Sequence, residues 1–489
     1  MLSDPLVIDI LSIYFFGLKT LAPLIAILIL ISSIDDFIID IIYFTRHVYR
    51  QLFIYNRHPR YSALDIEPKD ERPIAIMVPA WREADVIGKM LERLITNYNY
   101  ENYLVFVGVY PNDPQTLSEI RALKRRSEKA RKHICIVSTK KPGPTSKAQC
   151  LNQVYAYIQR LNVGERAHNR IYVIHDAEDI VHPLEPWVFN HLIPEKAMVQ
   201  IPVQPIYRDG IDMVGGHYAD EFAEAHRRDM VVRETLTKGV PSAGVGCAFS
   251  DEALARAATI RPLGPFNENS LTEDYDLALF IRAQELPQAF VHLTYKVNDD
   301  HRTHCVCSKA LFPNRFDEAV RQKTRWLIGI VFQGWEEFGW QGNMMQRYMF
   351  LRDRKALLTA PLNAAAYFLL LNIIFISTAP YLWPQFPGFG ALVEETPVLG
   401  VILCLNVGFL FHRAIQRVWH VSRIHGMKQG LKSLIRIPAA NIINFVATFR
   451  AMRQYRDAQG SGRKLEWDKT SHSFPTDAQV SSAFTVAGE

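Results

Sequence analysis

Three carboxylates fall within four residues of the sequence Asp176-Ala177-Glu178-Asp179, at the end of the apolar run Arg170–Asp176. Like charges this close repel one another unless a cation or the N-terminal end of a helix neutralises them. Carboxylate oxygens suit Mg²⁺ or Mn²⁺, which proteins bind through one or two carboxylates together with substrate phosphates. We therefore interpret this segment as a candidate Mg²⁺ or Mn²⁺ site for a phosphate-bearing substrate.

Two other segments carry residues suited to a nucleotide. Asp113 lies between two prolines, where it either begins a turn or hydrogen-bonds a base or ribose. Lys147 lies at the start of the expected helix Ser146–Leu161, from which it could reach a phosphate. The stretch 141–147 lacks the GxxxxGK[ST] spacing, which excludes a P-loop ATPase. The glycines of 242–247 favour either a close backbone approach to a ligand or a tight turn.

Later in the chain, two helical segments combine acidic, amide, guanidinium and indole groups. The run Thr272-Glu273-Asp274-Tyr275-Asp276 precedes the amphipathic helix Leu277–Gln284. A Thr cap followed by acids in the first turn is the ordinary structural explanation, because the helix dipole favours it. Gln322, Arg325 and Trp326 are spaced i, i+3 and i+4, so they share one face of a helix.

Strands and helices alternate between Arg72 and Pro205. The expected strands are Ile74–Val78, Leu104–Tyr110, Ile134–Thr139, Arg170–Asp176 and Met198–Val203, and the expected helices between them are Ala84–Tyr98, Thr116–Ala130 and Ser146–Leu161. This order predicts βαβ crossovers and an α/β domain with a mostly parallel, Rossmann-like sheet. Ligands bind at the carboxyl ends of such strands, where the turns with Asp113 and Asp176 lie.

Apolar runs at both ends of the chain predict three membrane spans, Leu6–Ile34, Ala356–Trp383 and Pro397–Phe411. Basic residues follow the first and third runs, which places the middle domain in the cytoplasm. The acids at 35, 36 and 40 indicate an amphipathic continuation at the cytoplasmic surface. The run Ile435–Phe449 is too short and polar to cross, so we predict a helix lying in the membrane interface.

The length of 489 residues allows about three structural units. The 55 basic and 50 acidic residues leave a formal charge of +5, which is too small to indicate a nucleic-acid partner. Six cysteines without a CxxC pattern indicate reduced thiols in a cytosolic compartment. The composition also excludes a disordered chain and a small disulfide scaffold.

Taken in order, these motifs resemble those of the processive family 2 glycosyltransferases, the class that includes cellulose and hyaluronan synthases. The matching positions are an early Asp (Asp113), an acidic metal motif (Asp176, Glu178), T-E-D (272–274) and Q-x-x-R-W (322–326). The last two together, just before membrane spans, are highly specific. The metal motif departs from the usual D-x-D, which leaves Glu178, preferred by spacing, or Asp179 as the second ligand.

The chain also resembles a narrower group, the NfrB-type inner-membrane glycosyltransferases associated with phage adsorption in bacteria. The similar stretches are 76–81, 110–114, 142–148, 241–246 and 467–470. This resemblance implies a GT-A domain on the cytoplasmic face of the inner membrane, with membrane helices at both ends of the chain. It also implies a UDP-N-acetylhexosamine donor, a growing envelope or secreted polysaccharide as acceptor, and an outer-membrane partner of the NfrA kind. Three spans make a slender channel, which a homo-oligomer or a partner chain would complete.

By this resemblance, Asp274 is the general base, with Glu273 and Asp276 as competitors. The metal ion is held by Asp176 and Glu178, and the phosphates by Arg325 and Lys147. The other substrate-binding residues are Asp113 at the nucleoside, Trp326 against the acceptor sugar, Glu273 and Gln322. Lys469 and Thr470 lie in a tail that either closes over bound nucleotide or simply docks on the domain.

Two other functions remain open at this point. The chain could be a non-catalytic membrane scaffold or phage-entry component, or a non-processive transferase that glycosylates a lipid carrier. The expected organisation is a membrane and juxtamembrane segment (1–60), the GT-A domain (61–310), interface helices with Q-x-x-R-W (311–355), two spans and an interfacial helix (356–450), and a cytoplasmic tail (451–489).

Overall fold

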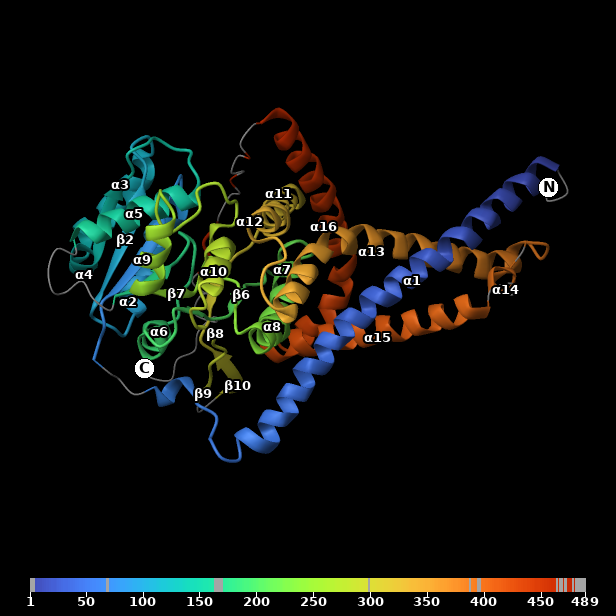
Figure 1. The fold of residues 1–489 in the computed structure, drawn as a ribbon, viewed down its shortest axis with the longest axis horizontal. Coiled ribbons are helices and arrows are strands. Elements are labelled where there is room, and N and C mark those ends of the chain that lie inside the picture. Colours follow the sequence, from blue (N-terminus) through green and yellow to red (C-terminus); the bar gives the residue numbers. More distant parts are fainter. Residues whose placement is uncertain are drawn as a thin grey trace.

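An α/β domain and a bundle of long helices that extends away from it make up the chain (Figure 1). The computed structural model describes residues 5–66, 70–161, 170–297, 300–386, 388–393, 397–462, 465, 469, 473–476 and 479. Thr470, which the sequence suggests as part of a lid, lies outside the described residues.

A seven-stranded sheet, in the order β3-β2-β1-β4-β7-β5-β8, forms the centre of the α/β domain. Its strands are β1 (Ile74–Pro79), β2 (Tyr103–Val109), β3 (Ile134–Ser138), β4 (Ile171–Ile174), β5 (Met198–Gln200), β7 (Cys247–Ser250) and β8 (Gln288–Phe290). Only β7 is antiparallel to its neighbours, β4 and β5, and the other pairs are parallel. The expected mostly parallel sheet is confirmed.

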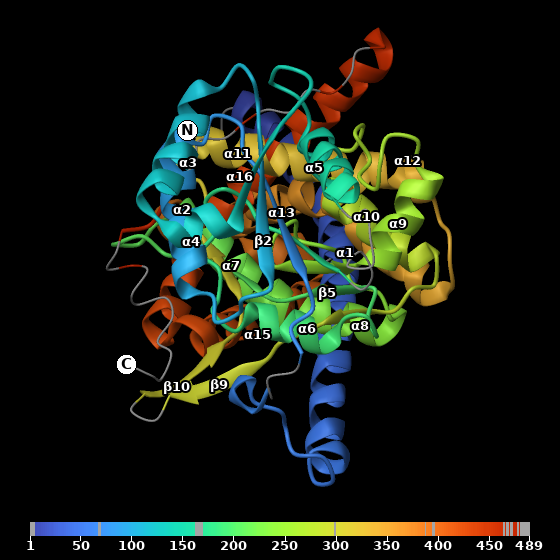
Figure 2. The ribbon, with the colours of Figure 1, turned by 90° about the vertical axis from the view of Figure 1, so that its left-hand side faces the viewer.

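Helices cover both faces of this sheet (Figure 2). Successive side chains of a strand point to opposite faces, so Ile76 and Val78 of β1 pack in one core and Met77 in the other. The first face is covered by α2 (Ala84–Asn97), α3 (Pro114–Arg126), α4 (Glu128–His133) and α6 (Glu185–Leu192), and the second by α5 (Lys147–Leu161), α9 (Asp251–Ile260) and α10 (Glu273–Ala283). Burial of both faces explains the continuous apolar runs of these strands.

Two elements predicted as continuous are each divided in two in the structure. The helix expected over Thr116–Ala130 is divided at Ser127, whose Oγ accepts a hydrogen bond from the Ala130 amide at 3.2 Å and so begins α4. The strand expected over Met198–Val203 is also divided. Pro202 cannot donate to a strand ladder, and β6 (Val203–Pro205) after it pairs with β11 (Ser308–Ala310) outside the main sheet. A hairpin of β9 (Thr294–Val297) and β10 (Asp300–Cys305) lies below the domain in Figure 1.

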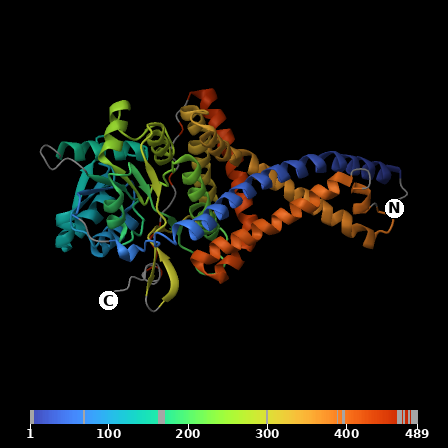
Figure 3. The same cartoon turned by 60° about the horizontal axis from the view of Figure 1, so that its bottom comes forward.

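Three long helices, α1 (Pro5–Tyr49), α13 (Met344–Leu382) and α15 (Pro397–His425), run side by side away from the sheet (Figure 3). By length and composition, α13 and α15 could each cross a membrane. The three helices share an apolar cluster that includes Phe15, Leu369 and Leu399. The span expected over Leu6–Ile34 lies within α1 and stays a prediction. Because α13 begins at Met344, it continues across the expected boundary at residue 356.

The run expected as an interfacial helix is the middle of a longer helix, α16 (Met427–Ser461). Arg436 of α16 is fully buried, and its guanidinium pairs with both carboxylate oxygens of Asp220 in α7 (Gly215–Glu224), at 2.7 and 2.9 Å. Bidentate pairs of this kind are strong and specific in geometry. This part of α16 is therefore held against the α/β domain.

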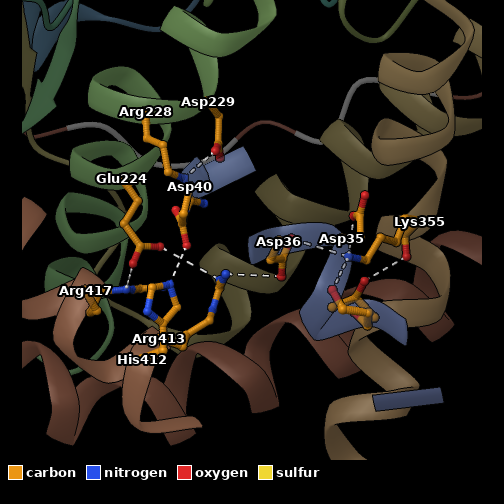
Figure 4. A network of polar contacts seen from close by, with 12 residues as sticks. Asp35, Asp36, Asp40, Glu224, Arg228, Asp229, Lys355, His412, Arg413 and Arg417 are labelled. Atoms are coloured by element: carbon orange, nitrogen blue, oxygen red, sulfur yellow. Dashed lines mark hydrogen bonds and ion pairs between the residues drawn. The ribbon is translucent and has the colours of Figure 1, made fainter. Parts of the chain in front are cut away.

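A network of ion pairs joins the long helices to the α/β domain (Figure 4). Asp40 of α1 accepts hydrogen bonds from Arg228 at 2.8 Å and from His412 of α15 at 2.9 Å. Farther along the same network, the ion pairs are Asp35 with Arg352 and Lys355, Asp36 with Arg413, and Glu224 with Arg417. The acids at 35, 36 and 40 are therefore cross-links between helices.

Replacing Arg228 by Met is expected to lower the free energy of unfolding by about 3–5 kcal/mol, because it leaves the buried Asp40 without its main cation. The side chains of Arg228 and Asp40 are only 4% and 5% exposed. The measurement is denaturant unfolding of the protein in detergent micelles. Arg256→Met is the control, since its pair with Glu252 is exposed and worth about 0.3–0.5 kcal/mol. Equal losses in the two variants would contradict a structural role for the network.

Candidate active site

A cavity of about 490 Å³ opens at the carboxyl ends of β1 and β4, between the N-terminus of α10 and helix α11 (Phe316–Leu327). Its size is within the range of small-molecule sites. Eight of the predicted site residues line it: Lys147, Asp176, Glu178, Glu273, Asp274, Gln322, Arg325 and Trp326. Segments up to 179 residues apart (147 to 326) therefore meet in one cavity, whereas Asp113 and Lys469 are not among its lining residues.

Lys147 is the central cation of this cavity. Its Nζ lies 2.6 Å from Asp176 Oδ1 and 3.8 Å from Glu273 Oε1. Burial alone would lower the pKa of Lys147, but the carboxylates of Asp176, Glu273 and Asp274 together raise it above its ordinary value. Lys147 is therefore charged at neutral pH and is placed to contact an anion that enters the cavity.

Burial raises the pKa values of the two acids that begin α10, Glu273 and Asp274. Burial brings the pKa of Glu273 to about 7, although Lys147 opposes both shifts. A carboxylate with a raised pKa is a stronger proton acceptor than one in water. Thr272 precedes them at the cap position, but its side chain makes no capping hydrogen bond, so the ordinary structural explanation of this motif is incomplete.

The glycine-containing segment 242–247, for which the sequence allows either a ligand contact or a tight turn, contributes residues 242–245 to the lining of the cavity. Gly244 has a φ of +78°, and a Cβ atom at this position would lie 2.7 Å from Asp274 Oδ2. Only glycine allows the backbone to pass this close to the carboxylate. The segment therefore forms one wall of the cavity beside Asp274.

Asp179 is occupied by hydrogen bonds that the sequence did not indicate. Its Oδ2 accepts from the Asp176 amide at 3.0 Å and lies 3.1 Å from His175 Nδ1. The other ring nitrogen of His175 lies 2.6 Å from Glu185 Oε1. Asp179 thus holds the turn in place, which favours Glu178 as the partner of Asp176 toward a cation.

The residues of the cavity fit a divalent ion that arrives with a substrate. Asp176 and Glu178 supply hard carboxylate oxygens, the donor type of Mg²⁺ and Mn²⁺. Within the described part of the chain, no group of three or more His, Cys, Asp or Glu residues could hold a metal ion. An ion here would need further ligands, which the phosphates of a bound nucleotide can provide.

Replacing His175 by Gln is expected to cost about 3–5 kcal/mol of stability at pH 7, because Asp179 and Glu185 then lose a buried cation. Burial alone would lower the pKa of His175, but Glu185 and Asp179 raise it to about 10. The stabilisation is complete below the unfolded pKa near 6.5 and is lost as the pH rises to about 10.

The check for His175 is the thermal unfolding midpoint of wild type and His175→Gln between pH 7 and pH 10. The difference between them should shrink across this range, because only the wild type loses the buried proton. A difference that stays constant would mean that His175 is neutral in the folded protein. The exposed His58, replaced in the same way, is the control.

Asp113 lies behind the cavity wall rather than on it. Its Oδ2 accepts a hydrogen bond from the Arg82 amide at 2.6 Å, and its Oδ1 accepts one from the Thr116 amide at 3.3 Å as the cap of α3. It thereby holds the turn after β1, of which Trp81 and Glu83 do line the cavity. The contact between Asp113 and a nucleoside stays a prediction.

The C-terminal tail reaches the same turn. Lys469 Nζ lies 2.7 Å from Glu83 Oε1 and donates a hydrogen bond to the Arg82 carbonyl oxygen at 2.7 Å. Phe474 then packs against the core of the α/β domain. Trp81 and Glu83 were not among the predicted site residues, although the turn that contains them directly follows an expected strand end.

The Q-x-x-R-W residues form the opposite side of the cavity. Trp326 packs at the edge of an aromatic group, with its ring centroid 5.9 Å from that of Tyr218 and 6.2 Å from that of Phe222. Gln322 Oε1 is buried and has no hydrogen-bond partner among the described residues. An acceptor atom left in this state is suited to a ligand hydroxyl. The cavity continues from here to Ile39 of α1 and other residues at the base of the long helices.

Comparisons with known proteins identify the family to which the chain belongs. The family model described as glycosyltransferase like family 2 matches residues 71–329. Bacteriophage adsorption protein B of Escherichia coli K12 and bacteriophage N4 adsorption protein B of Escherichia coli O157:H7 are each 37% identical to the chain over 482 residues. The match covers 96% of this chain and 64% of each relative, so the chain spans just under two thirds of their length. A solved mannosyltransferase from Pyrobaculum calidifontis, in complex with GDP-mannose and Mn²⁺, is 16% identical with a TM-score of 0.49, over 86% of this chain and 98% of that one.

Proposed function

Because the chain belongs to glycosyltransferase family 2, we propose that it is a membrane-bound, inverting enzyme that extends an envelope or secreted polysaccharide from a UDP-N-acetylhexosamine donor. The observation that carries this proposal is the single cavity in which Lys147, Asp176 and Asp274 meet. A positive charge, a pair of metal-binding carboxylates and a buried base are what transfer from a nucleotide sugar requires.

The donor end of the reaction needs charge neutralisation. The bond from the sugar C1 to the diphosphate oxygen breaks, and negative charge grows on the leaving UDP. A Mg²⁺ or Mn²⁺ ion held by Asp176 and Glu178 would supply Lewis-acid stabilisation of that diphosphate. Lys147 contacts the phosphates as a point charge, and Arg325 can pair with them bidentately.

The acceptor end needs a base. The acceptor hydroxyl forms the new bond to C1 from the side opposite the diphosphate, and its proton passes to an Asp274 carboxylate oxygen. The burial that raises the pKa of Asp274 also increases its affinity for this proton. A single displacement of this kind inverts the anomeric centre. Asp276 is a poor alternative, since it lies 2.5 Å from Arg261 in an ion pair.

The position of the cavity supports delivery of the product toward the membrane. Gln322 and Trp326 contact the acceptor sugar on the side of the cavity that leads to α1 and α13. The exposed apolar side chains of α1, such as Phe16, Leu24 and Ile31, support a third span beside α13 and α15. Because basic residues follow the first and third spans, the α/β domain lies on the cytoplasmic face of a bacterial inner membrane.

The relatives named for phage adsorption suggest a place in an envelope assembly. We propose that the polysaccharide leaves the cell through an outer-membrane partner of the NfrA kind. A second copy of the chain would widen the passage that three spans alone leave narrow.

Lys469 is proposed to hold the tail over the nucleotide side of the cavity. Its contacts with Glu83 and the Arg82 carbonyl join the tail to the turn that lines the cavity. Lys469→Ala should therefore raise the KM for the donor several-fold with kcat unchanged. A lower unfolding midpoint with an unaltered KM would mean that the tail only docks.

The experiment that tests the proposed function is release of UDP from a panel of UDP-sugars by the purified protein in lipid vesicles, with Mg²⁺ or Mn²⁺. We expect cation-dependent release together with a polymer whose length grows with time. No release from any nucleotide sugar would favour a non-catalytic scaffold. Release with a single sugar added to lipid would favour a lipid-carrier transferase.

A further inference from the structure

A second, larger cavity of about 1020 Å³ lies apart from the catalytic cavity and shares no lining residue with it. It is enclosed by the C-terminal end of α1, the turns that follow up to Tyr61, the β9–β10 hairpin and the C-terminal end of α15. In Figure 1 these elements meet at the lower edge of the molecule, where the long helices join the α/β domain. We call it the basic cavity.

The charge on its walls is almost entirely positive. Its cationic lining residues are Arg46, Arg50, Arg60, Arg227, Lys309 and Arg423, and Glu234 is the one carboxylate among the lining residues. Glu234 Oε1 accepts a hydrogen bond from the Phe290 amide at 3.1 Å, and its charge acts on Arg46, so it offsets only part of the positive charge. In the part of the chain that the structure describes, no ion pair joins any of the five arginines to a carboxylate. Such a concentration of one sign attracts anions.

The pKa values of two histidines in the basic cavity, His47 and His292, are lowered by burial and in part by the positive charge of its arginines. Burial and then the charges of Arg60, Arg227, Arg423 and Arg46 lower the pKa of His47. Burial, followed by Arg227 and Arg60, lowers the pKa of His292 to about 4. Because the same arginines act on both rings, their charges converge on one space.

Aromatic faces accompany these charges. Arg50 and Arg60 both lie over the ring of Tyr55, with guanidinium carbons 5.1 and 6.0 Å from its centroid. Tyr43, Tyr61 and Tyr295 also line the basic cavity. Aromatic and guanidinium planes stack well on nucleobases, and arginine forks pair with phosphate.

We propose that the basic cavity binds a soluble nucleotide with two or more phosphate groups, at a site distinct from the donor cavity. Tyr43 lies nine residues beyond Ile34, the end of the expected span, which is about 13 Å along a helix. This distance favours a soluble ligand over a phospholipid headgroup. By joining arginines that otherwise repel one another, the ligand stabilises the junction between α1, α15 and the hairpin.

The test is calorimetric titration of the full chain in detergent with ATP in the presence of EDTA, together with the shift of the unfolding midpoint. Wild type should bind ATP and unfold at a higher temperature. Arg60→Glu with Arg423→Glu, two exposed positions, should weaken binding at least 10-fold. Arg125→Glu with Arg160→Glu, which makes the same charge change on exposed helix surfaces elsewhere, should leave binding unchanged.

Two further arms separate the other outcomes. Lys147→Met alters the donor cavity and should leave ATP binding in the presence of EDTA intact. The proposal would be overturned if Lys147→Met lost ATP binding while the Arg60→Glu, Arg423→Glu variant kept it. Dioctanoyl-phosphatidylglycerol is the lipid probe. Binding of this lipid without binding of ATP would assign the phosphate chemistry to a headgroup and overturn the soluble ligand. Binding of neither probe would overturn the site itself.

Discussion

The Asp274→Asn variant is expected to lose glycosyl transfer by about 10²–10⁴-fold, the usual contribution of a positioned general base. The amide cannot take the acceptor proton, and yet it fills the same space beside Gly244 and next to Lys147. UDP binding and membrane insertion should therefore be retained. The measurement is the rate of UDP release at saturating donor, alongside UDP affinity.

Two comparisons make the Asp274 result specific. Asp85→Asn, on the exposed first turn of α2, is the control and should keep the wild-type rate. Glu273→Gln tests the neighbouring acid, whose pKa is also raised. If Asp274→Asn turns over at the wild-type rate, Asp274 is not the base.

The Asp176→Asn variant is expected to need about 10–100-fold more Mn²⁺ for half-maximal activity. Loss of a residue that merely hydrogen-bonds a metal ligand already weakens metal binding by this factor. Asp176 is one of only two carboxylates proposed to hold the ion, and it also pairs with Lys147 at 2.6 Å. The measurement is UDP release as a function of Mn²⁺ concentration at fixed donor.

The choice between Glu178 and Asp179 is tested in the same assay. Glu178→Gln should raise the Mn²⁺ requirement as Asp176→Asn does. Asp179→Asn should chiefly lower stability, because Asp179 is hydrogen-bonded to His175 and to the Asp176 amide. The reverse pattern would assign the metal to Asp179.

The order of β1 to β4 and the helices between them could be predicted because buried parallel strands leave apolar runs separated by amphipathic helices. The position of β7 could not, since its antiparallel pairing with β4 and β5 joins segments far apart and has no local signature. The break at Pro202 was visible in the sequence, but the pairing of β6 with β11 was not.

Only the family resemblance placed Asp274 in this site, because Asp274 begins α10 and follows none of the predicted strands. The approach of Lys147 and Asp176 could be predicted from the rule that strand ends meet at one edge of a parallel sheet. The directions of individual side chains could not. Asp179 turns inward because it is hydrogen-bonded to His175, whose other ring nitrogen contacts Glu185. Asp113 accepts hydrogen bonds from two backbone amides. Likewise, the acids at 35, 36 and 40 look like a solvated face until their partners on α13 and α15, more than 300 residues away, are known.

The most direct test of the central claim, that carboxylates from separate segments form one cation-dependent donor site, is Mn²⁺ binding followed by electron paramagnetic resonance. The purified protein would be titrated with Mn²⁺ in the presence and absence of UDP. We expect one tightly bound Mn²⁺ per chain only when UDP is present, and none in Asp176→Asn. UDP binding that is equally tight without any divalent ion, or Mn²⁺ binding that Asp176→Asn leaves unchanged, would contradict the account.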